Sequence, residues 1–150
     1  MVRLGGKQLE NHKDTLDRWL SLSDGYFSVQ HKLEQALEEQ YQLSLKEFYT
    51  LYFICNAEDK KLRLQQLQEM IGLSQSATSR LVVRMEAKSC GALERHTCED
   101  DKRGIYTRIT ELGENKLQRA LITFNELLQQ EIEPEQFIQL QHIFKKRNHK

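Results

Sequence analysis

The sequence predicts a mainly α-helical protein with one small β-hairpin, and therefore an α+β chain. Apolar residues recur at helical spacing through most of the 150 residues, and only two short segments beyond the middle alternate like strands. A short helix is also followed, after a turn of about three residues, by a longer helix, which is the pattern of a helix-turn-helix. We therefore expect a winged helix-turn-helix core flanked by N- and C-terminal helices that form a dimerisation layer.

The first half of the chain contains one very long helical pattern and one short central helix. Residues 9–40 should form a single helix, or two helices that meet near Asp24 and Gly25, where the glycine weakens the pattern. Such a helix cannot bury its whole apolar stripe in a small domain, so we expect a partner to cover it. Ser44 and Glu47 form a capping box, which starts a second helix that should be central because it is apolar on most sides.

The helix-turn-helix follows a short strand predicted at residues 60–64. Residues 65–71 form its first helix, with Gly72 as the left-handed C-cap, and Ser74 caps a second helix over residues 74–88. The second helix has two faces, because its apolar positions fall within one arc. This arc consists of Thr78, Leu81, Val82 and Met85.

The opposite arc of this helix is polar and consists of Gln75, Ser76, Ser79, Arg80, Val83 and Arg84. Small polar groups permit a close approach to another surface, and arginines contact phosphates or guanine edges, so a helix seated in a DNA major groove needs such a face. The alternative is an ordinary solvated helix.

The second half of the chain contains the hairpin and two further helices. Residues 92–96 and 104–109 are predicted strands, and the charged segment 97–103 between them is the hairpin tip, or wing. Thr110 caps a helix that runs to about residue 131, and Pro134 suits the first turn of a final helix. Both helices carry apolar stripes beyond the needs of the winged core.

Residues 44–113 resemble the winged helix-turn-helix core of the MarR family of bacterial transcriptional regulators. The matching segments are residues 64–82 of the helix-turn-helix, Asp-Lys-Arg-Gly at 101–104 in the wing, and Ile-Thr-Glu-Leu-Gly at 109–113. Helices before and after this core match in order and length, so the resemblance covers nearly the whole chain. One departure is Ser-Cys-Gly at 89–91, which looks like a small insertion before the first wing strand.

The resemblance implies a homodimer that places two winged domains on adjacent major grooves of a palindromic double-stranded DNA operator. Residues 1–43 would be a dimerisation helix, residues 44–110 the DNA-binding domain and residues 111–150 further dimerisation helices. The implied function is transcriptional regulation, most often repression, released by a small molecule or an oxidant. Carried over by position, the DNA-binding residues are Gln75, Ser76, Ala77, Ser79, Arg80, Arg84, Lys102 and Arg103, and Asp101 would brace the wing.

The distribution of charge agrees with a DNA partner, although the net charge is zero. Residues 60–108 carry 10 basic and 6 acidic side chains, whereas residues 1–59 carry 6 and 10. An enzyme is not expected, because the chain has no Gly-rich phosphate loop, no local Ser-His-Asp grouping and no metal-ligand spacing. The remaining alternative is a winged helix that binds protein instead of DNA.

Aromatic and cysteine residues are the candidates for sensing a signal. The resemblance places a small-molecule effector between the dimerisation helices and the winged domain, and aromatic residues are candidates to line that site, although they could equally be core. These candidates are Trp19, Tyr26, Phe27, Phe48 and Tyr52. Cys90 and Cys98 lie near basic side chains that favour the reactive thiolate, so they are candidate redox sensors, with inert thiols as the alternative.

Several classes of site are not expected. The three cysteines are an odd number without CxxC spacing, so we expect no disulfide framework and no zinc ribbon. The five histidines are scattered, and a tetrahedral site needs three or four convergent ligands, so we expect no metal; no cofactor is expected either. No apolar run approaches the roughly 20 residues that span a bilayer, and no signal peptide is evident, so a cytoplasmic protein is expected.

Overall fold

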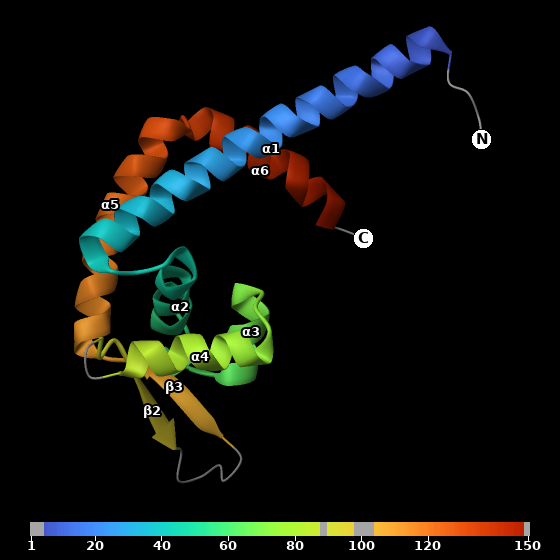
Figure 1. The fold of residues 1–150 in the computed structure, drawn as a ribbon. Helices are drawn as coiled ribbons and strands as arrows, with labels where there is room; N and C mark the ends of the chain where they lie inside the picture. The colour runs from blue at the N-terminus through green and yellow to red at the C-terminus, as the bar shows by residue number, and fades with distance from the viewer. Residues whose placement is uncertain (1–4, 88–89, 98–103, 149–150) are drawn as a thin grey trace.

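The computed structural model describes residues 5–87, 90–97 and 104–148. The helices are α1 (Gly6–Tyr41), α2 (Leu45–Cys55), α3 (Leu64–Ile71), α4 (Gln75–Glu86), α5 (Glu111–Glu131) and α6 (Pro134–Asn148). A 3₁₀ turn η1 (Glu58–Lys60) precedes strand β1 (Lys61–Arg63), and the hairpin is formed by β2 (Leu93–Thr97) and β3 (Ile105–Ile109). The predicted fold class, a winged helix-turn-helix core flanked by helices, is confirmed (Figure 1).

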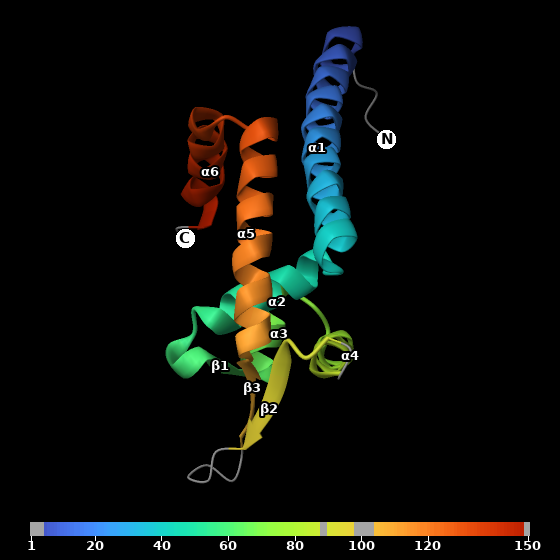
Figure 2. The same ribbon diagram turned by 90° about the vertical axis from the view of Figure 1, so that its left-hand side faces the viewer.

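The first helix is continuous through Gly25 and extends far beyond the winged core (Figures 1 and 2). Only its C-terminal part reaches the core, where Leu33 and Leu37 are buried. Residues 5–28 are exposed throughout. Among the described residues, no helix combines the length and apolarity needed to cross a membrane.

The predicted helix ends are confirmed by their hydrogen bonds. Ser44 and Glu47 form the reciprocal capping box, with the Glu47 amide donating to the Ser44 hydroxyl over 3.1 Å. Gly72 has φ +70°, the left-handed conformation that a residue without Cβ adopts at no steric cost. The Ser74 and Thr110 hydroxyls accept amide hydrogens in the first turns of α4 and α5. These local signals fix where the helix-turn-helix and the helix after the wing begin.

The three strands form an antiparallel sheet in the order β1-β3-β2. Alternation places Leu62, Leu93, Thr107 and Ile109 on the buried face, against the helices. The hairpin β2–β3 projects downward from the end of the molecule that also carries α4 (Figures 1 and 2). This arrangement sets α4 and strand β2 side by side.

One core joins the winged domain to the C-terminal helices. Leu51 and Ile54 of α2 are fully buried at its centre, and Leu117 and Ala120 of α5 belong to the same cluster. The ring of Phe48 stacks on that of Phe124 with centroids 4.9 Å apart. α5 is therefore part of the core of the winged domain.

From Arg119 onward, α5 also packs along α1. The Tyr41 hydroxyl donates to the Arg119 carbonyl oxygen over 3.0 Å, and Lys32 forms an ion pair with Glu131 at 2.9 Å. α6 then turns back from the end of α5 and diverges from it (Figures 1 and 2). These helices form the second layer that the sequence predicts.

Candidate nucleic-acid interface

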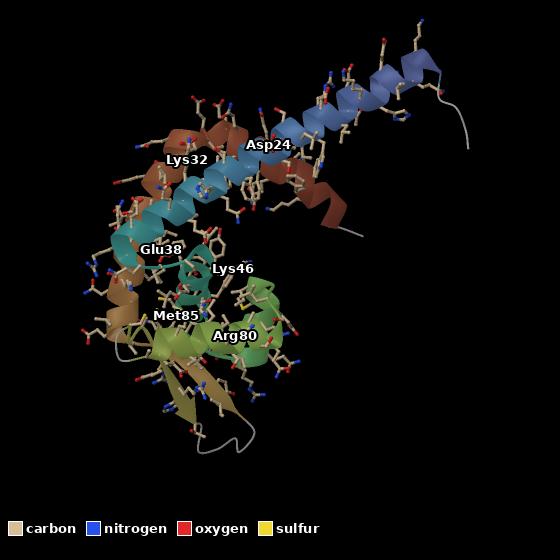
Figure 3. All side chains as sticks on the ribbon, viewed as in Figure 1. Asp24, Lys32, Glu38, Lys46, Arg80 and Met85 are labelled. Atoms are coloured by element: carbon tan, nitrogen blue, oxygen red, sulfur yellow. The ribbon has the colours of Figure 1, made fainter. Side chains whose placement is uncertain are left out.

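The two faces of α4 are separated as the sequence predicts. Its buried residues are Thr78, Leu81, Val82 and Met85. The opposite face is open to solvent at Gln75, Ser76, Arg80, Val83 and Arg84, while Ala77 and Ser79 are half-buried. Figure 3 marks Arg80 and Met85 along this helix. The exposed face offers amide, hydroxyl and guanidinium groups from one side of a single helix.

The start of α4 is held by hydrogen bonds to Ser74. The Ala77 amide donates to the Ser74 hydroxyl over 3.2 Å, and the Thr78 hydroxyl donates to the Ser74 carbonyl over 2.8 Å. The hydroxyls of Ser74 and Ser76 lie 3.3 Å apart. The first turn, where a recognition helix meets DNA, is therefore fixed in place while its polar side chains remain accessible.

Two contacts that support α4 are not evident from the sequence. The Lys46 ammonium of α2 donates to the carbonyl oxygen of Ile71 over 2.7 Å, at the C-terminal end of α3. A cation at this position is favoured by the helix dipole and ties α2 to the helix-turn-helix. Arg95 of β2 forms an ion pair with Glu86 in the last turn of α4 at 3.0 Å. This second pair links the base of the wing to α4.

The wing tip lies outside the described residues, and with it Asp101, Lys102, Arg103 and the redox candidate Cys98. Of the segment 89–91, residue 89 also lies outside them. Cys90 is half-buried, and its role as a redox sensor stays a prediction. Gly91 has φ +62° and its carbonyl oxygen accepts the Thr110 hydroxyl over 2.6 Å, so the turn before β2 is anchored to the start of α5.

The start of α5 also packs very closely on this turn. A Cβ built on Gly113 would overlap the carbonyl oxygen of Ala92 and approach the Ile109 side chain to 2.8 Å. Only glycine fits, so the third residue of α5 can touch the backbone that leads into β2. The sequence contains this glycine, but its packing partner is visible only in the fold.

An apolar cavity of about 570 Å³ lies between α1, α5 and α6, with α2 contributing Tyr49. Its wall residues from α1 are Tyr26, Val29, Gln30 and Leu33, and those from the C-terminal segment are Phe124, Leu128, Ile132, Phe137, Leu140, Gln141, Phe144 and Lys145. Burial, together with the nearby Tyr26 and Glu34, raises the pKa of Tyr49, which keeps its hydroxyl neutral. The lining is apolar, with polar groups at a few points.

Only Tyr26 among the predicted effector residues lines this cavity. Phe48 is buried in the core against Phe124 instead. Trp19 and Phe27 lie on α1 with exposed fractions of 59% and 70%, because Trp19 precedes the segment that meets α5, and Phe27 is turned about 100° from Tyr26. Tyr52 is exposed on α2. The five aromatics are therefore not brought together within one chain.

Metal ligands do not gather in the part of the chain that the structure describes. There, no group of three or more His, Cys, Asp or Glu side chains is placed to hold an ion.

Proteins of known structure that are similar to this chain have the same fold. A model described as MarR family matches residues 41–104. The chain is similar to AbsC, a MarR family transcriptional regulator from Streptomyces coelicolor, at 20% identity over 99% of this chain and 96% of that one, with TM-score 0.79. It is also similar to Sco3205 of the same family and organism, solved in complex with DNA, at 20% identity over 99% and 89%, with TM-score 0.78.

A third similar structure is the organohalide-sensing transcriptional regulator RdhR-CbdbA1625 in its 2,4-dichlorophenol-bound form. It is 21% identical over 99% of this chain and 88% of that chain, with TM-score 0.72. No curated protein matches the chain. At these identities the likeness establishes the fold, and α4 with its exposed polar face is the feature from which a function can be argued.

Proposed function

Because residues 41–104 belong to the MarR family and the whole chain has the fold of MarR-family regulators, we propose that this protein is a sequence-specific DNA-binding transcriptional regulator. The observation that carries this proposal is α4, whose apolar side is buried while its polar side is presented to solvent. Gln75, Ser76, Ser79, Arg80 and Arg84 would contact bases and phosphates, with Ala77 allowing close approach. The Sco3205 structure in complex with DNA supports this use of the fold.

The second part of the proposal is a homodimer on a palindromic operator. Large apolar side chains are exposed along α1 and α6, at Leu9, Leu16, Trp19, Leu20, Leu22, Tyr26, Phe27, Phe137, Ile138, Ile143 and Phe144. An apolar surface of this extent is typical of an interface, and dimers of intertwined helices commonly bury more than about 2,000 Å². Residues 1–43 and 111–150 would pair with a second copy, and residues 44–110 would bind DNA.

Dimerisation matters for recognition because it fixes the distance between two α4 helices. A two-fold dimer reads half-sites about 34 Å apart, one turn of B-DNA. Binding at such a site blocks a promoter, so we propose repression as the mode of action. A cytoplasmic location follows from a DNA partner.

The effector we propose is a small, mainly apolar aromatic molecule bound in the α1–α5–α6 cavity. The cavity volume of about 570 Å³ lies within the range of small-molecule sites, and its lining is largely apolar. The bound dichlorophenol of RdhR-CbdbA1625 supports a ligand of this class. Binding there would change the angle between the helices of the two layers and release DNA.

The proposal is tested by DNA binding in solution. Purified protein is titrated into labelled DNA from upstream of its own gene, with an unrelated duplex of equal length as competitor. We expect a specific complex that Arg80→Ala weakens and that Glu58→Gln, a change at an exposed residue outside both α4 and the dimerisation segments, leaves unchanged. Absence of a specific complex on this DNA and on a pool of random-sequence duplexes would instead favour a winged helix that binds protein.

A further inference from the structure

Val83 is an exposed apolar residue on the polar face of α4. Its side chain is 50% exposed, and among the described residues of α4 it is the one large apolar side chain open to solvent. The core does not require it, because the buried arc of this helix is filled by other side chains, namely Thr78, Leu81, Val82 and Met85. Helix stability does not explain it either, since a β-branched residue has a lower helix propensity than alanine. Val83 is therefore a candidate for a contact outside the chain.

The surface of α4 around Val83 is polar or small. Residues three or four positions apart are neighbours on a helix, and those of Val83 are Ser79, Arg80, Glu86 and Ala87. Surfaces that bind protein are contiguous apolar patches, and a single valine beside a hydroxyl and a guanidinium is not a patch of that kind. A valine in this setting instead fits a small apolar group that is itself surrounded by hydrogen-bonding groups.

The charges near Val83 favour DNA. Arg80 and Arg84 lie three residues before it and one residue after it, and both are exposed. The one acidic residue in the sequence of α4 is Glu86, whose carboxylate forms an ion pair with Arg95 of β2 at 3.0 Å. Val83 therefore lies in a region of α4 with net positive charge, which DNA phosphates can approach.

Val83 also lies in line with the start of α4. It follows Ser76 by seven positions, so the two side chains point within roughly 20° of each other and lie about 10.5 Å apart along the helix axis. The major groove of B-DNA is about 12 Å wide, and successive base pairs are about 3.4 Å apart. A helix that lies in the groove with Ser76 against one base pair therefore brings Val83 against a base edge about three pairs away.

We propose that Val83 contacts the C5 methyl group of a thymine in the operator half-site, and so selects thymine at that position. This inference rests on the proposed function, because α4 must lie in the major groove. In that groove thymine presents a methyl group beside its O4 acceptor, and no other ordinary base presents one. The contact removes apolar surface of both groups from water, so it adds specificity without a hydrogen bond.

The test removes the methyl group from the DNA. An operator is selected from random-sequence DNA by the wild-type protein, and its thymines are replaced by deoxyuridine one position at a time, symmetrically in both half-sites. Deoxyuridine keeps the base pairing and the O4 acceptor and lacks only the C5 methyl group. At one position wild type should bind about fourfold more weakly per half-site, which is the effect of exposing one buried methyl group.

Two substitutions link this loss to the side chain of Val83. Val83→Ser has a similar helix propensity but no methyl group, so it should bind the thymine and deoxyuridine duplexes with equal affinity. Val83→Ile keeps a branched apolar side chain and should retain the preference for thymine. Arg80→Ala is the matched control on the same face of α4. It should bind both duplexes more weakly and leave the ratio of their affinities unchanged.

The results that would overturn the inference are specific. They are a selected operator without thymine in its half-sites, a wild type that no deoxyuridine replacement weakens, or a Val83→Ser variant that loses as much affinity as wild type at the sensitive position. The first two results require only the wild-type protein, so the test remains decisive even if a variant does not fold. Failure of wild type to select any duplex would overturn the proposed function itself.

Discussion

The separation of α4 into a structural face and a binding face predicts opposite effects for two neighbouring residues. Leu81 is only 2% exposed and belongs to the core, whereas Arg80 is exposed on the polar face. Leu81→Ala removes buried methyl and methylene groups and leaves a cavity, which typically costs about 2 to 5 kcal/mol. Arg80→Ala removes no core contact, and a surface change of this kind stays within about 0.5 kcal/mol of the wild-type stability.

These free energies correspond to measurable changes in Tm and in operator affinity. For a protein of this size, 1 kcal/mol corresponds to about 2 to 4 °C in Tm, so Leu81→Ala should melt about 4 to 20 °C below wild type. Arg80→Ala should melt with wild type. Its operator affinity should fall by about 1 to 3 kcal/mol per half-site, which is roughly 5- to 150-fold.

Calorimetry at a fixed protomer concentration gives the Tm, since oligomers melt in a concentration-dependent way, and fluorescence anisotropy with labelled operator gives the affinity. The operator affinity of Leu81→Ala should be measured well below the Tm of this variant. There the affinity should remain close to that of wild type. The reasoning fails if Arg80→Ala lowers the Tm as much as Leu81→Ala does, or if folded Arg80→Ala binds the operator like wild type.

Three other consequences can be measured. Wild type should sediment as a dimer at micromolar concentration, and Trp19→Glu should raise the dimer dissociation constant more than tenfold, because exposed tryptophans are typical interface hot spots; a monomeric wild type would contradict this. Gly113→Ala should lower stability by about 1 to 3 kcal/mol in denaturant titrations, because its Cβ would overlap the Ala92 carbonyl, and a neutral effect would show that this packing is loose. The hydrogen bond from Lys60 to Glu114 raises the pKa of Lys60 above 10.5, so the stabilisation it gives is complete below pH 10.5 and is lost as pH rises through the folded value. The Tm difference between wild type and Lys60→Met should therefore shrink above pH 10.5, and a constant difference would exclude the charge as its cause.

Features set by neighbours in the sequence could be predicted. The capping box at Ser44, the left-handed Gly72 and the N-caps at Ser74 and Thr110 each depend on a few consecutive residues, and all are present in the structure. The burial of one face of α4 follows from helical periodicity in the same way. The candidate DNA-binding face was therefore recognisable before the fold was known.

Features that join distant segments could not be predicted from such signals. The stacking of Arg63 on Tyr106 depends on the register between β1 and β3, and the pairing of Glu86 with Arg95 crosses the turn before β2. Which residues line the apolar cavity depends on how α6 turns back after α5. The sequence shows that Trp19 and Tyr26 are aromatic, but only the packing shows that Tyr26 faces the cavity while Trp19 lies beyond it.

α5 belongs both to the winged domain and to the layer of N- and C-terminal helices, so it connects the two rigidly. Its first half is embedded in the core of the winged domain through Leu117 and Ala120, and its second half reaches Leu128 at the cavity wall. Leu117 and Leu128 are about 16 Å apart along the axis at 1.5 Å per residue, with no proline or glycine between them to absorb bending. If the cavity binds an effector as proposed, a tilt of the cavity end of α5 would rotate the winged core as a rigid body, and a small displacement far from DNA would change the orientation of α4 relative to the major groove.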